Sequence, residues 1–477
     1  MDEDKVFIVN RGETDLRLDV PFHRPSLVRY IQRIDAHPAG IEPIRNLAIK
    51  VVDGPFGTQL KADEYVDSGI PLIRVSDVRT GKISRDGLVY ITPEKQDALC
   101  RSRVLPNDVV LTKAGAILGY AAVFPDSLVE GNITSHSVLI RCQDRILPQF
   151  LAYFLRSAPG QRQVYRWGNK ATRPELNTQE VKRIHVPLLS IDKQREIIAI
   201  MSEGERRSET FLADAMRLLS SIDDYLLAEL GITLPPEPEK TITNRTFLAQ
   251  RHALAGWRFD PQFHKPWFVM VNEALNSCHY RKPRIRDLCH LPVGGATPTR
   301  GDDSLYAQEG VKFIRIMNVG KDELVLNDVK YINKFVHEKD LFRSQLSEND
   351  ILMTITGRVG TAAVVTQDIL PANINQHIVR LRLRVSDCYP DYLSLYLNCS
   401  LGTILSNRPV TGGTRIALDY PTISALQVPL PPRDVQRKIL GRVGELRAEA
   451  KRFRQQAEVE IEVAKRRIEA MLLGETA

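Results

Sequence analysis

Several segments of this chain contain the glycine, proline or histidine residues used in catalytic loops, but each lacks the context that catalysis needs. The segment Thr356–Gly360 lacks the third glycine and the strand-to-helix setting of a dinucleotide-binding loop. No Walker A sequence is present, and neither Pro235-Pro236 nor Pro431-Pro432 follows the Asn or Asp of an adenine methyltransferase loop. His136 and His377 have no Ser or Cys nucleophile motif beside them, so we interpret them as hydrogen-bonded structural histidines. The motifs indicate no catalytic centre.

The charge balance of the chain favours a negatively charged partner. The 65 lysine and arginine residues outnumber the 58 aspartate and glutamate residues, giving a formal charge of +7 and a pI of about 9.0. An excess of this size is typical of proteins that bind nucleic acid, although a basic soluble enzyme has the same balance. The length of 477 residues allows about two to four domains.

Cysteine usage and hydropathy predict a cytoplasmic protein without a structural metal. The six cysteines form no CxxC pair, and such sparse usage suits a reducing compartment. The neighbouring residues Cys278-His279 and Cys289-His290 do not have zinc-finger spacing. No signal peptide is recognisable, and no apolar stretch approaches the roughly 18 residues of a membrane span. We therefore expect cytoplasmic localisation and no membrane partner.

The most informative feature is an internal repeat at an offset of 241 or 242 residues. Chance matches do not keep one register over almost a whole chain, so the sequence predicts a duplicated domain pair. The two copies differ most between the matched segments, as in 74–105 against 315–347. This pattern suits a shared scaffold with two different recognition surfaces, and drift in surface loops would produce it too. Matched pairs include Arg17–Pro25 with Arg258–Pro266, Asn107–Thr112 with Asn349–Thr354, Asn132-Ile133 with Asn373-Ile374, and Gln194-Arg195 with Gln436-Arg437.

The first part of each copy is rich in predicted strands. Short apolar runs stand between Gly, Pro and Asn residues, and a short helix is expected after each set, near 149–157 and 391–399. Each copy therefore begins with a mixed α+β globule of about 180 residues. The predicted strands are 109–111, 121–124 and 137–140 in the first copy, and 313–314, 351–353, 363–365 and 378–381 in the second.

The second part of each copy is predicted to be one long helix, starting after Pro187 and after Pro431-Pro432. Apolar residues recur at steps of three and four, which indicates a coiled-coil seam; a single amphipathic helix lying on its own domain is the alternative. Leu230-Gly231 and Leu473-Gly474 are expected to end the helices. Because the apolar stripe of an isolated helix would stay exposed to water, we expect the two helices to pack on each other. The stripe residues are Ile197, Met201, Gly204, Ser208, Phe211, Ala215, Leu218, Ile222 and Tyr225, and Ile439, Val443, Leu446, Ala450, Phe453, Ala457, Ile461, Ala464, Ile468 and Met471.

This order of variable globule, long helix, variable globule and long helix resembles the specificity subunits of Type I restriction-modification systems over essentially the full length. The resemblance is carried by residues at the strand ends and helix starts, by a late loop in each copy, and by an early glycine-rich loop in the second copy. Gly54–Thr58 departs from the family's early glycine-rich loop, which leaves the contacts of that segment less defined. The similar segments are Val186–Leu188 with Gln194-Arg195, Val428–Pro432 with Gln436-Arg437, Gly294–Pro298, Gly412–Arg415 and Asn169–Arg173.

The resemblance implies a fold and a set of domains. The fold class is α+β, with two β-rich target recognition domains in tandem, each followed by a long helix, and the two helices packed as an antiparallel coiled coil. The first recognition domain spans 1–188 and the first spacer helix 189–232. A proline-rich linker follows at 233–244. The second recognition domain spans 245–430 and the second spacer helix 431–477.

The resemblance also implies a function in defence against phage. A member of this family is a non-catalytic subunit that reads a bipartite, asymmetric site in double-stranded DNA. Its expected partners are two modification subunits, which methylate DNA using S-adenosylmethionine, and restriction subunits, which use ATP and Mg²⁺; the chain itself would hold no cofactor. Two alternatives stay open: a methyltransferase or nuclease with unrecognised motifs, and a coiled-coil scaffold.

Donor side chains in loops are the candidates for DNA contacts, since Lys and Arg bind phosphates and base edges. Arg74 and Arg315 each end an apolar run, and they could instead form buried structural pairs. No catalytic or metal-binding residue is predicted. The candidate DNA-binding residues are Lys61, Arg74, Lys113, Lys170 and Arg173 in the first copy, and Thr297, Arg300, Arg315, Arg358 and Arg415 in the second.

Overall fold

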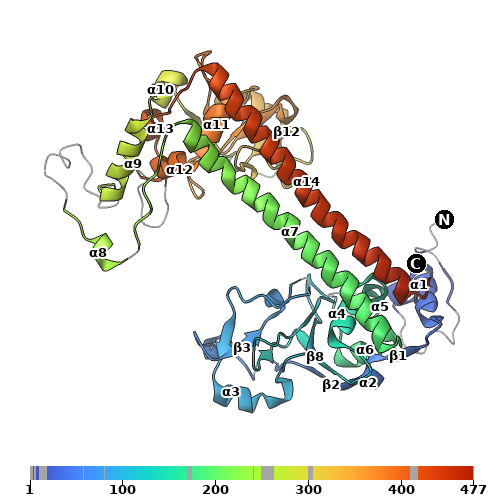
Figure 1. The fold of residues 1–477 in the computed structure, drawn as a ribbon. Coiled ribbons are helices and arrows are strands. Elements are labelled where there is room, and N and C mark those ends of the chain that lie inside the picture. Colours follow the sequence, from blue (N-terminus) through green and yellow to red (C-terminus); the bar gives the residue numbers. More distant parts are fainter. Residues whose placement is uncertain are drawn as a thin grey trace. The chain divides into compact units, whose positions relative to one another are not determined.

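The structure is a computed structural model, and the chain divides into two compact units. The first unit contains residues 1–213 and 453–477, and the second contains residues 214–452. Each unit therefore includes one globule and one part of each long helix (Figure 1). The residues that the structure describes are 4, 7–9, 19–56, 59–79, 81–168, 174–239, 241–248, 263–298, 305–408 and 417–475.

The globule of the first unit contains two main sheets. An antiparallel sheet has the order β2-β8-β5-β6, and a second sheet has the order β4-β3-β7 with β3 and β7 parallel. A small ladder, β1-β9, leads into the long helix. The strands are β1 Ile41–Pro43, β2 Ala48–Asp53, β3 Ile70–Ile73, β4 Val89–Ile91, β5 Val109–Thr112, β6 Ala121–Val123, β7 Asn132–Ile133, β8 Ser137–Cys142 and β9 His185–Pro187, and the helices are α1 Pro25–Asp35, α2 Ile44–Leu47, α3 Pro93–Ala98, α4 Pro148–Arg156, α5 Ala158–Gly168 and α6 Thr178–Lys182.

The globule of the second unit repeats this arrangement. Its sheets have the orders β10-β17-β14-β15 and β11-β13-β12-β16, and β12 and β16 are parallel, as β3 and β7 are. The strands are β10 Val293–Gly294, β11 Tyr306–Ala307, β12 Val311–Ile314, β13 Lys330–Ile332, β14 Ile351–Thr354, β15 Ala362–Val364, β16 Ala372–Ile374 and β17 Ile378–Leu381, and the helices are α8 Ile242–Arg245, α9 Pro266–Ser277, α10 Ile285–Leu288, α11 Pro390–Asn398, α12 Ser400–Asn407 and α13 Tyr420–Ala425.

The core of each globule lies between its antiparallel sheet and the helix pair that follows it. In the first unit, Phe150 and Phe154 of α4 are fully buried with the apolar residues of β5 and β8. In the second unit, Tyr392 and Tyr396 of α11 take the same places, and their hydroxyls donate to the carbonyl oxygens of Pro429 (2.5 Å) and Gln427 (2.9 Å). The predicted short helices are therefore confirmed, and they lie on the core side of the sheets.

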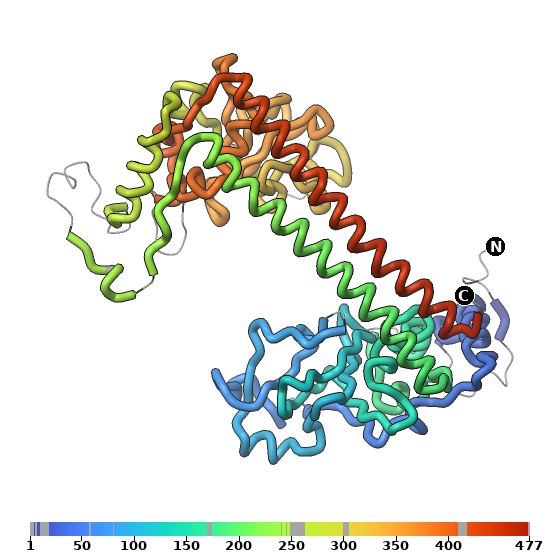
Figure 2. Tube along the Cα trace, in the orientation of Figure 1, coloured from blue at the N-terminus to red at the C-terminus, as the bar shows by residue number. Residues whose placement is uncertain are grey.

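The long helices are α7, Ile191–Glu229, and α14, Arg433–Leu472 (Figures 1 and 2). The predicted stripe is largely buried, which confirms the seam. In the first unit the rings of Phe211 and Phe453 stack at 5.9 Å, and a side chain at Gly204 would meet Ala464. Because a position later in α7 faces one earlier in α14, the two helices are antiparallel. The predicted α+β fold with packed long helices is confirmed.

The ends of both helices follow the sequence signals. Gly231 and Gly474 have φ of +67° and +69°, a conformation that glycine adopts without steric cost. Ile232 N–H donates to the Leu227 carbonyl at 2.9 Å, and Glu475 N–H donates to the Ala470 carbonyl at the same distance. These are the backbone bonds of the Schellman motif, so both predicted helix stops are confirmed.

A buried glutamine fixes the start of each long helix to its globule. The Gln194 amide accepts from Leu147 N–H (2.8 Å) and donates to the carbonyls of Arg145 (3.0 Å) and Leu189 (2.9 Å). Gln436 makes the matching three bonds to Tyr389, Asp387 and Pro431. Both side chains are almost fully buried, so these bonds form in a low-dielectric setting and hold the helix N-terminus rigidly.

Among the described residues, no helix has the length and apolarity needed to cross a bilayer.

Candidate nucleic-acid interface

In the first unit, three loops meet at one end of the antiparallel sheet, and we call residues 54–56, 113–119 and 134–136 the first rim. Gly54 N–H donates to the Ser137 carbonyl at 3.2 Å, and a Cβ at Gly54 would lie 2.3 Å from the Thr134 oxygen. Lys113 N–H donates to the His136 carbonyl at 2.8 Å. The loop 134–136 is thus held between the other two, and only glycine fits at position 54.

The second unit contains the same three loops, and we call residues 294–298, 355–360 and 375–377 the second rim. Gly295 N–H donates to the Ile378 carbonyl at 3.2 Å, and a Cβ there would lie 2.0 Å from the Ile374 oxygen. Ile355 N–H donates to the His377 carbonyl at 3.0 Å. The backbone of the rim is therefore duplicated even though most of its side chains differ.

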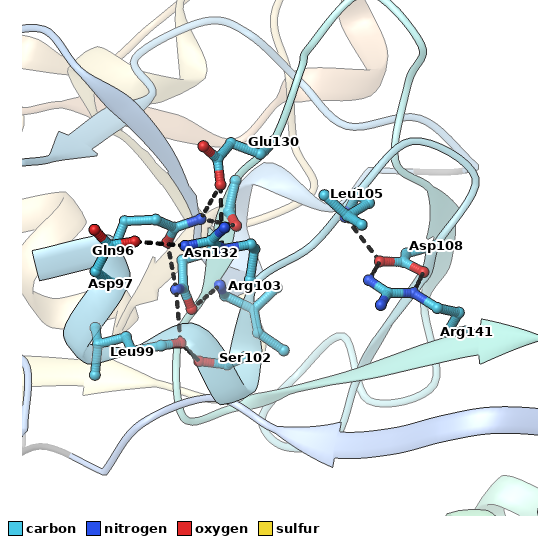
Figure 3. Close-up of polar contacts among 12 residues, drawn as sticks. Gln96, Asp97, Leu99, Ser102, Arg103, Leu105, Asp108, Glu130, Asn132 and Arg141 are labelled. Atoms are coloured by element: carbon cyan, nitrogen blue, oxygen red, sulfur yellow. Dashed lines mark hydrogen bonds and ion pairs between the residues drawn. The ribbon is translucent and has the colours of Figure 1, made fainter. Parts of the chain in front are cut away.

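Buried polar networks beneath the first rim hold its loops in place (Figure 3). Asn132 precedes the loop 134–136, and its amide donates to Gln96 Oε1 (2.6 Å) and to the Leu99 carbonyl (3.3 Å). The Gln96 amide in turn donates to Glu130 (2.8 Å) and to the Gly131 carbonyl. Asn373 is the matching residue of the second unit, where it donates to the Leu341 carbonyl at 2.8 Å.

A buried aspartate–arginine pair supports the sheet in each unit. The Asp108 carboxylate accepts two hydrogen bonds from the Arg141 guanidinium (2.8 and 2.7 Å) (Figure 3). The Asp350 carboxylate accepts the matching two from Arg382 (2.6 and 2.7 Å). The carboxylates also accept the backbone N–H of Leu105 and of Ser347. These hydrogen bonds raise the pKa of both guanidinium groups above the usual value. The pairs belong to the shared scaffold.

Arg74 and Arg315 each pair with an aspartate of their own domain. Arg74 donates through Nε and Nη2 to Asp77, each at 3.0 Å, and its side chain is 35 % exposed. Arg315 donates to the Asp328 carboxylate at 2.8 Å, and its side chain is 25 % exposed. The hydrogen bonds to Asp77 raise the pKa of Arg74. Both arginines are paired, as in the alternative of buried structural pairs, but only Asp77 is buried, since the Asp328 side chain is 69 % exposed.

Lys113 lies within the first rim with its charge already partnered. Its Nζ is 3.5 Å from Asp53 Oδ2 and 5.7 Å from the centre of the Phe56 ring, and the residue is buried. Arg101 reaches the same carboxylate at 2.9 Å. Lys61 is exposed and begins the short helix Ala62–Glu64, in which Glu64 accepts its backbone N–H at 2.7 Å. Of the two lysines, Lys61 has the charge that an approaching phosphate can reach.

Thr297 and Arg358 lie in the second rim. The exposed Thr297 hydroxyl donates to the Gln376 side chain, so the early glycine-rich loop contacts the loop 375–377. Arg358 makes two long bonds, both 3.4 Å, to the carbonyls of Ile316 and Val319. Weak bonds of this length leave the Arg358 guanidinium available for a stronger acceptor.

The remaining candidates, Lys170, Arg173, Arg300 and Arg415, lie outside the described residues. The described chain resumes beside the rims: Leu176 N–H donates to the Lys113 carbonyl at 2.8 Å, and Leu418 N–H donates to the Ile355 carbonyl at 2.9 Å. The position of the four side chains stays a prediction.

Two rim residues were missed in the sequence. Gln376 is exposed between β16 and β17, and its amide group can pair with an adenine edge. The polar run Asn375–His377 between two apolar strands was the available signal. Phe56 is 61 % exposed in the first rim, and an exposed aromatic ring of this kind suits contact with a thymine methyl group or a base face.

No group of three or more His, Cys, Asp or Glu side chains that could hold a metal ion occurs in the part of the chain that the structure describes. The six cysteines are free thiols, and burial raises the pKa of Cys142, Cys289, Cys388 and Cys399 to about 12. Thiols with such a raised pKa stay protonated and are poor nucleophiles at neutral pH.

Comparison with known proteins gives one consistent set of relatives. Residues 280–462 match the family model of the Type I restriction modification DNA specificity domain. A 179-residue stretch is 30% identical to the Type I restriction enzyme EcoBI specificity subunit of Escherichia coli, covering 37% of this chain and 36% of that subunit. A putative type I restriction enzyme MjaX specificity subunit of Methanocaldococcus jannaschii is 21% identical over 420 residues, covering 85% of this chain and 86% of that one.

A solved chain reported for complex assembly and conformational transition of the type I R-M system has the same fold. It aligns with a TM-score of 0.50 and 18% identity, covering 91% of this chain and 96% of that chain. A likeness at this identity concerns the fold alone.

Proposed function

Since the chain belongs to the family of Type I restriction-modification specificity subunits, we propose that it reads a bipartite, asymmetric site in double-stranded DNA without catalysing a reaction itself. The observation that supports this role is the duplicated rim. Two copies of one scaffold present different exposed side chains, the ring of Phe56 in one, and the polar groups of Thr297 and Gln376 in the other. Two dissimilar surfaces on one chain suit two dissimilar half-sites.

The proposed organisation keeps the domains predicted from the sequence. Residues 1–188 and 245–430 form the reading domains, 189–232 and 431–477 form the spacer helices, and 233–244 link the halves. The helices dock two modification subunits, which bring S-adenosylmethionine, and restriction subunits bring the ATP-dependent motor and its Mg²⁺. No residue of this chain is assigned to any of these cofactors.

We rank the proposed DNA contacts by the exposure and pairing of each side chain. Lys61, Thr297, Arg358 and Gln376 present groups that DNA can reach, so we expect direct contacts from them. Arg74, Lys113 and Arg315 are engaged inside their own domains, so their expected role is to orient the rim. Lys170, Arg173, Arg300 and Arg415 keep their predicted role as loop contacts.

Exchange of one reading domain tests the proposal. Residues 17–185 are replaced by the corresponding region of another family member, and the hybrid is produced with its modification subunits. Sequencing of methylated DNA should show one altered half-site and one unchanged half-site. Alteration of both half-sites, or of neither, would contradict independent reading by two domains, and methylation by the purified chain alone would contradict a non-catalytic role.

A second test concerns the spacer helices. Adding one heptad to α7 and one to α14 keeps the seam in register and lengthens each helix by about 10 Å. Because B-DNA rises about 3.4 Å per base pair, the preferred gap between half-sites should grow by about three base pairs. An active protein with an unchanged gap would leave the helices only the role of docking partners.

A further inference from the structure

In the first unit, the globule rests on α7 through a joint in which the helix is negative and the globule positive. Glu205 of α7 accepts from Arg156 at 3.2 Å and from the Tyr153 hydroxyl at 2.9 Å. One turn further along the helix, Glu209 pairs with Lys82. Gly81 leaves the space for this arrangement, because a Cβ at that position would lie 2.0 Å from the Arg156 guanidinium. Lys82, Arg156, Glu205 and Glu209 are the first joint.

In the second unit, the corresponding joint has the opposite polarity. Arg447 of α14 pairs with Asp322, whose other oxygen accepts from Ser394 (2.8 Å) and Asn398 (2.7 Å). Asp322 has φ of +62°, and Gly81, at the same place in the repeat, has φ of +80°, so the two backbones follow the same turn. We call Asp322 and Arg447 the second joint, together with Glu323 and Lys451, which the repeat matches to Lys82 and Glu209.

The inversion holds at three positions matched by the repeat, whereas Arg156 matches the uncharged Asn398, which donates to Asp322. The helix positions Glu205 and Glu209 correspond to Arg447 and Lys451 at an offset of 242 residues. The globule position Lys82 corresponds to Glu323 at an offset of 241 residues, next to the pair Gly81 and Asp322. From the first joint to the second, the two acidic residues on the helix are replaced by basic residues, and the basic Lys82 on the globule is replaced by the acidic Glu323.

Burial makes part of this inversion energetically relevant. The side chains of Arg156 and Glu205 are 18 % and 24 % exposed, and Asp322 is 10 % exposed beside Arg447 at 41 %. Lys82 and Glu209, at 64 % and 60 %, are mostly solvated and contribute little as an attractive pair. Opposed like charges at a packed joint are unfavourable, and interfaces use such repulsion to reject a wrong partner.

We propose that the two joints form a charge code that makes each reading domain compatible with the helix of its own half and incompatible with the helix of the other. Chain connectivity delivers each domain to its helix, since β9 leads directly into α7. The charges then fix the orientation of the domain on its helix. They also disfavour a chain in which copies of one domain occupy the positions on both α7 and α14. A duplicated second domain on α7 would set Asp322 and Glu323 against Glu205 and Glu209.

The joint residues are positioning residues, and their effect on DNA rests on the proposed function. Each domain must present its rim in a fixed orientation for its half-site to be read. Domain stability and orientation on the helix can be measured without DNA, so the code can be tested even if the proposed function fails.

The decisive experiment uses one substitution pair in two proteins. E205R/E209K is introduced into the full native chain, and into a chimera in which residues 19–187 are replaced by a copy of residues 260–429. In the native chain the substitutions oppose Arg156 and Lys82, and limited proteolysis at the junction of domain and α7 should become about tenfold faster. In the chimera they face the acids of the transplanted domain, so cleavage should become slower.

Two further variants keep the result interpretable. The native chain carrying K82E/R156E together with E205R/E209K should regain most of the protease resistance, and the exposed Glu458→Arg on α14 is the matched control with no expected effect. The same direction of change in native chain and chimera, or no rescue by the fourfold variant, would overturn the code. If the chimera does not fold, the rescue in the native chain alone decides. A different outcome bears on the proposed function. If the native chain keeps its proteolysis pattern but gives no sequence-specific methylation together with its modification subunits, the proposed function is wrong and the charge code is not.

Discussion

The two halves of this chain agree in their buried polar contacts and differ on their surfaces. Asp108 and Asp350 hold an arginine in the same bidentate way, and Gln194 and Gln436 make the same three bonds. At the rims, by contrast, Phe56 corresponds to Thr297 and Ser135 to Gln376. Matched positions therefore build the domain, while unmatched positions are where we place recognition.

The equivalence of the two scaffolds is tested most strongly at the aspartate–arginine pairs, where the largest loss of stability is expected. Asp108→Ala or Asp350→Ala removes the carboxylate that accepts from a partly buried guanidinium and from a backbone N–H, although Arg382 keeps its bond to the Ser347 hydroxyl. Each should lower the free energy of unfolding of its own half by about 2–4 kcal/mol. Hydrogen exchange followed by mass spectrometry reports the two halves separately. Asp97→Ala, at an exposed side chain that pairs with Arg103, is the control and should have little effect. A large loss in one half only would show that the two scaffolds are not equivalent.

The buried glutamines should give the next largest effect. Gln194→Ala or Gln436→Ala removes three hydrogen bonds at a helix start, with an expected cost of roughly 2–3 kcal/mol. Faster hydrogen exchange should be confined to the first turns of α7 or α14 and the segment that the glutamine held. Lys193→Ala, at an exposed neighbour that pairs with Glu196, is the matched control. Exchange that is unchanged in both glutamine variants would mean that packing alone holds the helix start.

The fold could be predicted where local pattern decides it. Strands such as Val109–Thr112 and the seams of α7 and α14 follow from apolar periodicity, and the glycine stops follow from backbone preference. Helices α5 and α12 were not predicted, because each follows the preceding helix after a single residue and has no separate start signal. The division of each domain into two sheets was also missed, since strand pairing depends on contacts distant in sequence.

The candidate site was less predictable than the fold. Arg74 and Arg315 were selected as basic residues after strands, yet Asp77, three residues along the chain, engages Arg74, and Asp328, thirteen residues along, engages Arg315 in the folded chain. Gln376 was overlooked because it is uncharged, although it contacts Thr297 across the second rim. Residue type alone identifies a possible donor, whereas its availability depends on tertiary contacts.

Substitution of a residue that contacts a base from one rim should change the preference at one half-site only, which tests whether the two rims read DNA independently. Gln376→Ala removes an amide that can pair with a base edge, so we expect a loss of about 1–3 kcal/mol and relaxed preference at one position of one half-site. Ser135→Ala, at the matching place of the first rim, should leave that half-site unchanged. Methylation sequencing of complexes with each variant measures both effects. Relaxation in both half-sites from Gln376→Ala would remove the independence of the two rims.

The smallest expected effect belongs to Lys61, whose exposed ammonium group should contact a phosphate. A phosphate contact stabilises all DNA sequences equally, because its energy comes from charge and counterion release. Lys61→Ala should therefore weaken binding uniformly and lower the slope of log K against log salt by about one, with no change in the methylated sequence. Lys61→Arg keeps the charge and should keep the slope, whereas Arg74→Ala, which frees Asp77 inside the domain, should cost stability before it changes the slope. Filter binding across a salt series with specific and unrelated duplexes measures these slopes. A sequence-dependent loss in Lys61→Ala would place the side chain at a base edge, and Lys61 would then be a residue that reads sequence and not one that only binds phosphate.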